Sequence, residues 1–128
     1  LSISSQVHML GWISGEEKVS VLSQSKIFCL PSYAEGFPMA IIEALSYKIP
    51  VISTRCGRID LVLQNGEHIL YFDMGDVDQL ANIMEKLMKD KELRSNIGLN
   101  GHNYAEKYFK LDVVINQLSD IYVRLLNE

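Results

Sequence analysis

Short apolar runs alternate with helix-like stretches over the first 75 residues, and this alternation constrains the fold most strongly. The runs are rich in Val, Ile and Phe, and we expect them to be strands at residues 7–10, 27–30, 51–54 and 69–72. The stretches between them predict helices at roughly residues 16–25, 38–47 and 58–64. Strands that alternate with helices favour βαβ units, and runs without polar alternation fit strands covered on both faces. The chain is therefore predicted to be α/β, with three α/β/α layers and a parallel sheet of about four strands.

The remainder of the chain reads as helical. Asp76 is a predicted N-cap, and Gln79 stands at the capping-box position three residues later. Asp90 predicts the cap of a following helix, which Gly98 and Gly101 interrupt at a cost of about 1 kcal/mol each relative to Ala. Asp76 also begins a D-x-D pattern that could bind a divalent metal, but its place at a helix start favours capping.

Composition bounds the class of protein. The chain has 128 residues, of which 48% are hydrophobic, so we expect one domain over 1–128 with residues 76–128 as its helical part. A net charge of −4 gives no sign of a nucleic-acid partner, and no apolar run reaches the ~20 residues of a membrane helix.

Two isolated cysteines, Cys29 and Cys56, fit reduced thiols in the cytoplasm. The first residue is not Met, so we expect a fragment of a longer protein.

The stretch PSYAEGFPMAIIEAL, residues 31–45, follows the expected strand at 27–30. Pro38 fits the first position of a helix, and no Asp, Ser or Thr directly precedes it to bond the next N–H groups. Such a helix start attracts anions, and Gly36 allows a ligand to approach the backbone closely. In open α/β sheets, ligands bind beyond the carboxyl ends of the strands, where this loop is expected.

Two carboxylates belong to this stretch. Glu35 precedes the helix, and Glu43 lies five residues past Pro38, or about 7.5 Å along the axis. They could hold the hydroxyl groups at two ends of an extended ligand, with an anion between them, as in a nucleotide sugar. Alternatively, Glu43 is solvated or pairs with Arg55 or Lys48. The nearly all-apolar helix around Glu43 instead favours a buried carboxylate, which needs hydrogen-bond partners.

The segment from Glu35 to Leu45, EGFPMAIIEAL, resembles the E-x7-E signature of glycosyltransferase family 4, whose members have the GT-B fold. SYKIPVIS, residues 46–53, is similar to the family's Ala-Cys-Gly-x-Pro-Val-Ile-Ala, with Lys48 in place of Gly. VHMLGW, residues 7–12, is similar to the family's Val-x-Phe-Leu-Gly strand and loop. CGRID, residues 56–60, stands where Gly-Gly-x-x-Glu is usual.

This resemblance implies a Rossmann-like half of a GT-B fold that binds the donor of a retaining, metal-independent transferase. The donor would be a UDP-, GDP- or ADP-sugar, and no cofactor is expected. Glu35 is the catalytic candidate, at the hydroxyls of the donor sugar near the reaction centre, and Glu43 would bind the ribose. The substrate-binding candidates are Gly36, Phe37, Pro38, Met39, Ala40, Glu43 and Gly57, with Gly11 and Trp12 near the base.

The resemblance also implies what else the protein needs. An acceptor glycan, lipid-linked sugar or small molecule would bind through an N-terminal domain that this chain lacks, so the chain alone is expected to be inactive. That domain could hold the protein at the inner face of the membrane. Residues 112–127 have an apolar face that would then be exposed, or covered in a homodimer. The alternatives are a non-catalytic nucleotide-sugar or partner-binding module, and another GT-B enzyme such as a sugar-nucleotide epimerase or a phosphorylase.

Overall fold

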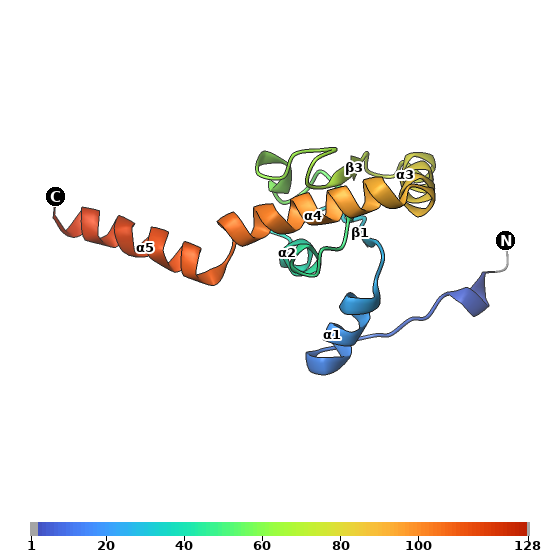
Figure 1. Ribbon diagram of the computed structural model, residues 1–128, viewed down its shortest axis with the longest axis horizontal. Coiled ribbons are helices and arrows are strands. Elements are labelled where there is room, and N and C mark those ends of the chain that lie inside the picture. Colours follow the sequence, from blue (N-terminus) through green and yellow to red (C-terminus); the bar gives the residue numbers. More distant parts are fainter. Residues whose placement is uncertain (1–2, 128) are drawn as a thin grey trace.

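A computed structural model describes residues 3–127 and contains a parallel sheet of three strands in the order β1-β2-β3. The strands are β1 (Phe28–Leu30), β2 (Val51–Thr54) and β3 (Leu70–Phe72). The predicted parallel sheet is confirmed, but the predicted strand at residues 7–10 is wrong. That segment is irregular and belongs to an arm lying away from the sheet (Figure 1), and Met9 within it is 92% exposed. No strand pairs with it in the described part of the chain, so nothing holds it in a ladder.

Helices cover both faces of the sheet, which confirms the three layers. On one face pack α1 (Gly15–Gln24), α2 (Met39–Ser46) and α4 (Lys91–Tyr108), and on the other packs α3 (Val77–Lys89). Successive residues of β2 belong to different hydrophobic clusters, one on each face of the sheet. Val51 belongs to the same cluster as Leu45 of α2, and Ile52 belongs to the same cluster as Leu87 of α3. Two short 3-10 turns, Ser4–Gln6 and Ile59–Leu61, complete the first part of the chain, the second replacing the helix predicted at 58–64.

Aspartate caps begin both α3 and α4, as predicted. The Oδ1 atom of Asp76 accepts a hydrogen bond from the Gln79 N–H at 2.8 Å, and that of Asp90 accepts one from the Leu93 N–H at 2.8 Å. The side chain of Gln79 accepts from the Asp73 N–H rather than returning to Asp76, so the reciprocal half of the capping box is replaced by a bond to the preceding turn. Asp76 therefore acts as a cap.

The two glycines of α4 do not interrupt that helix, which runs unbroken. A Cβ atom on Gly98 would lie 2.2 Å from the carbonyl oxygen of Lys48, and one on Gly101 would lie 2.5 Å from Cδ2 of Leu45. Both neighbours belong to the end of α2 or directly follow it. The glycines therefore allow α4 to pack against the C-terminal end of α2, and that packing fixes the helix on which Glu43 lies.

The last helix, α5 (Leu111–Leu126), extends away from the rest of the molecule (Figure 1) and buries none of its residues. The expected exposure of its apolar face is confirmed: Leu118 is 50% exposed and Ile121 is 44% exposed. In the chain from residue 3 to residue 127, no helix combines the length and the apolar character needed to cross a membrane.

Candidate functional site

The loop after β1 leads into α2 through Pro38. With φ −76° and ψ 87°, Pro38 is the N-cap, so its predicted place at the first helical position is wrong by one residue. Its carbonyl oxygen accepts a bond from the Ile41 N–H at 3.0 Å, which removes one of the donors expected to be free. The N–H groups of Met39 and Ala40 donate no hydrogen bond to any described residue, so two donors remain at this helix start.

The loop after β2 packs directly on the Glu35–Pro38 turn. Gly57 has φ +65°, and a Cβ atom on it would lie 2.9 Å from Cβ of Glu35, 2.9 Å from the oxygen of Gly36 and 3.0 Å from Cδ of Pro38. No larger residue fits there without displacing the turn. The structure therefore brings four of the predicted site residues together at the carboxyl edge of the sheet, while a Cβ on Gly36 would meet no atom within 4 Å.

Glu35 is exposed, but one of its oxygens is held. Its Oε1 atom accepts a hydrogen bond from the Ser32 hydroxyl at 2.6 Å, while its Oε2 atom bonds no described residue. The carbonyl oxygen of Ser32 accepts from the hydroxyl of Thr54, which is buried at the end of β2. The sheet thus anchors the loop, and the loop orients the carboxylate.

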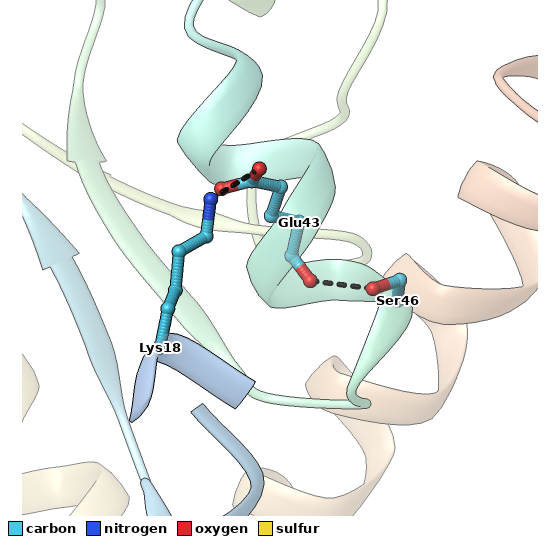
Figure 2. Close-up of polar contacts among 3 residues, drawn as sticks. All are labelled: Lys18, Glu43 and Ser46. Carbon is cyan, nitrogen blue, oxygen red and sulfur yellow. Dashed lines mark hydrogen bonds and ion pairs between the residues drawn. The ribbon is translucent and has the colours of Figure 1, made fainter. Parts of the chain in front are cut away.

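Glu43 pairs with Lys18 of α1. The Nζ atom of Lys18 lies 2.6 Å from Oε1 of Glu43, and the two side chains are 40% and 43% exposed (Figure 2). The expected burial of this carboxylate is therefore wrong, and so are the alternative partners Arg55 and Lys48. The hydroxyl of Ser46 donates to the backbone carbonyl of Glu43 at 2.7 Å and leaves the carboxylate alone.

Sequence reasoning missed Lys18. A cavity of about 290 Å³ has both Lys18 and Glu43 in its lining, together with Ile13 and Ala40. A usable signal was present in the sequence, because Lys18 precedes the partly buried Val21 and the buried Leu22 by three and four residues, which is one face of a helix. The site candidates now comprise two carboxylates, each held by one donor, on either side of a helix start.

Comparison with known proteins decides the family. The model of the family described as glycosyl transferases group 1 matches residues 1–104. The chain belongs to this family.

The chain is also similar to individual glycosyltransferases and solved structures. The capsular polysaccharide biosynthesis glycosyltransferase CapM of Staphylococcus aureus is 34% identical over 113 residues, which are 88% of this chain and 30% of CapM. Sucrose-phosphate synthase from Thermosynechococcus elongatus superposes with a TM-score of 0.87 at 25% identity over 98% of this chain and 31% of its own. Anabaena HepE in complex with UDP gives a TM-score of 0.80 at 19% identity, over 86% of this chain and 30% of its own. The chain spans about a third of the length of the curated relatives it matches.

One of the departures named in the sequence analysis has a structural counterpart. Lys48, which stands in place of Gly in the motif that the chain resembles, adopts φ +60° directly after the C-cap of α2, Tyr47. The Lys48 N–H donates to the carbonyl of Leu45 at 3.0 Å, and the Ile49 N–H donates to that of Ala44 at 3.2 Å. These two bonds form a Schellman motif, whose left-handed residue is usually glycine.

The remaining predicted site residues divide into two groups. Phe37 packs edge-on against Phe109 with ring centroids 5.8 Å apart. Phe37 and Met39 line an apolar cavity of about 430 Å³, together with Val114 of α5. Trp12 is 94% exposed and, like Gly11, is not in the lining of the cavity that contains Glu43. The predicted place of Gly11 and Trp12 near the base therefore stays a prediction, and the next residue, Ile13, lines the same cavity as Glu43.

Three further reactive groups have partners or surroundings of their own. The guanidinium of Arg55 stacks 4.7 Å from the ring centroid of Tyr71, and burial raises the pKa of the Tyr71 hydroxyl. Burial also raises the pKa of the Cys29 thiol, which keeps it protonated and a poor nucleophile. Within residues 3–127, no three His, Cys, Asp or Glu side chains are grouped so as to hold a metal ion.

Proposed function

We propose that this chain binds the donor of a retaining glycosyltransferase of the E-x7-E type, which uses a UDP-, GDP- or ADP-sugar without a metal ion. One observation carries the proposal. Glu35 and Glu43 lie on either side of the start of α2, and in each the Oε1 atom accepts a bond from a protein donor, Ser32 or Lys18, whereas Oε2 bonds no described residue. Two oriented carboxylates with a free oxygen each are suited to two sets of hydroxyl groups.

Each part of a nucleotide sugar has a counterpart here. Glu35 accepts hydroxyls of the donor sugar at the reaction centre, and Glu43 accepts the ribose hydroxyls. The free N–H groups of Met39 and Ala40 and the positive end of α2 face the diphosphate between them. Gly57 keeps the neighbouring loop close to this turn without covering it. Donors fixed before the reaction stabilise the charge that develops on the departing diphosphate.

The whole protein extends the proposal beyond this chain. Because the relatives are about three times longer, the acceptor, which we propose to be a glycan, a lipid-linked sugar or a small molecule, would bind elsewhere in the protein. We propose that the chain alone binds donor without turnover, and that the reaction takes place in the cytoplasm or at the inner face of the membrane.

A donor screen on the full-length protein tests this function. Transfer from UDP-, GDP- and ADP-sugars would be measured with the wild type, Glu35→Gln and Glu43→Gln. We expect Glu35→Gln to lower kcat by about 10²-fold or more, and Glu43→Gln to raise KM by about tenfold, since one lost hydrogen bond of ~1.4 kcal/mol is a factor of ten.

Glu85→Gln is the matched control, because Glu85 is an exposed carboxylate of α3 that also pairs with a lysine, Lys89. It should leave both constants unchanged. Wild-type activity in Glu35→Gln and Glu43→Gln would end the assignment, as would a product of inverted configuration for the retaining mechanism.

A further inference from the structure

The ion pair between Lys18 and Glu43 joins two helices, and both side chains line one cavity. The residues are 25 apart in the chain, and Lys18 is the only cation among the side chains that line this cavity within the described chain. Half-exposed ion pairs contribute about 0–1 kcal/mol to stability, so stability alone explains little of this arrangement. What the pair does fix is the rotamer of a carboxylate that lies beside an open space of about 290 Å³.

The hydrogen-bonding capacity of the pair leaves room for a ligand. An ionised carboxylate has about four acceptor sites, and the Lys18 ammonium uses one on Oε1. The Oε2 atom and its lone pairs remain for two neighbouring hydroxyl groups. Without the ammonium, the carboxylate of Glu43 would rotate about its flexible side chain, and forming two hydrogen bonds to a rigid diol would then cost rotamer entropy.

We propose that Lys18 is a positioning residue: it holds Glu43 in the orientation that accepts the ribose hydroxyls of the nucleotide, without itself contacting the reacting atoms. This inference rests on the proposed function of Glu43 and adds the group that makes it effective. It predicts a specific defect. Removing Lys18 should weaken the preference for a ribonucleotide over an analogue without the 2′ and 3′ hydroxyls, and should affect the analogue little.

The test measures dissociation constants with the full-length protein by calorimetry. The probes are whichever of UDP, GDP and ADP binds most tightly and its 2′,3′-dideoxy analogue, and the readout is the ratio of the two constants. We expect the wild type to prefer the ribonucleotide by about 10- to 100-fold, one to two hydrogen bonds at a factor of ten each. In Glu43→Gln the ratio should be only about two. In Lys18→Met the ratio should be at least fivefold smaller than in the wild type.

Two further variants separate positioning from a structural role. Lys18→Arg keeps a donor at this place and should restore most of the ratio, and the double variant Lys18→Met/Glu43→Gln should be no worse than Glu43→Gln alone, because both act through one group. Lys89→Met is the control, since Lys89 forms an exposed ion pair with Glu85 on α3. A purely structural Lys18 would weaken both probes equally and leave the ratio unchanged.

The outcomes distinguish this inference from the function on which it rests. A wild-type ratio in Lys18→Met together with a collapsed ratio in Glu43→Gln overturns the role of Lys18 and leaves the donor site standing. Failure of all three nucleotides to bind, or an unchanged ratio in Glu43→Gln, overturns the donor site and the positioning role together.

Discussion

Lys48 shows at the scale of one residue how the chain tolerates strain beside its site. It lies in the left-handed region with φ +60°, which costs an L-residue about 1–2 kcal/mol. The two hydrogen bonds of the Schellman motif and the buried Ile49 that follows keep it there. The motif ends α2 at the same place in the sequence where a glycine would end it without strain.

Replacing Lys48 by Gly should therefore stabilise the protein. The gain in the free energy of unfolding should be about 0.5–1 kcal/mol, because the relief of left-handed strain exceeds the extra entropy that glycine has in the unfolded chain. Urea unfolding with an unchanged m-value would measure it. Gly at the preceding Tyr47, whose φ is −91°, is the control and should not stabilise. A loss of stability in Lys48→Gly would show that the lysine side chain, not its backbone, matters.

At the scale of elements, the site depends on how α4 packs against α2. Gly98 lies where a Cβ atom would meet only backbone: the oxygen of Lys48 at 2.2 Å, its carbon at 3.1 Å and the nitrogen of Pro50 at 3.3 Å. His102 adds a ring nitrogen 3.1 Å from the carbonyl oxygen of Leu45. The close approach of these two helices thus fixes the end of α2 and the entry to β2.

Gly98→Ala should destabilise the fold although Ala favours helices. Backbone atoms cannot move aside as a side chain can, so overpacking should cost about 1–3 kcal/mol and outweigh the ~1 kcal/mol gain in helix propensity. Thermal and urea unfolding would measure the net loss in the free energy of unfolding. Ser95→Ala, an exposed position of the same helix, should change it by less than about 0.5 kcal/mol. Equal stability of Gly98→Ala and the wild type would contradict the close packing.

The same elements show what the sequence could and could not reveal. The three paired strands and the caps at Asp76 and Asp90 were predictable, because local apolar runs and capping side chains determine them. Residues 7–10 have the composition of a strand yet form none, because a strand also requires a neighbour. The partner of Glu43 could not be read from its own segment, since it depends on where α1 packs relative to α2.

At the scale of the whole molecule, the described chain consists of a packed body and a helix that adds little to it. Every buried side chain lies between Leu22 and Ala105, and α5 contributes none. Only its first turn reaches the body, where Leu111 and Val114 line the apolar cavity beside Phe37. Isolated helices of about this length are marginal in water, so the rest of α5 should open without unfolding the sheet.

Ending the chain after Ile115 should therefore leave the free energy of unfolding within about 1 kcal/mol of the full chain, because no buried apolar surface is lost. Urea unfolding measures this change, and hydrogen exchange should show weakly protected amides in residues 116–126 of the full chain against strongly protected ones in β2. Light scattering at several protein concentrations tests the alternative that a homodimer covers this face. A large loss of stability on truncation, together with a mass that falls from dimer to monomer, would mean that a second copy covers this face. The same loss in a chain that is monomeric throughout would instead mean that α5 folds back on its own body.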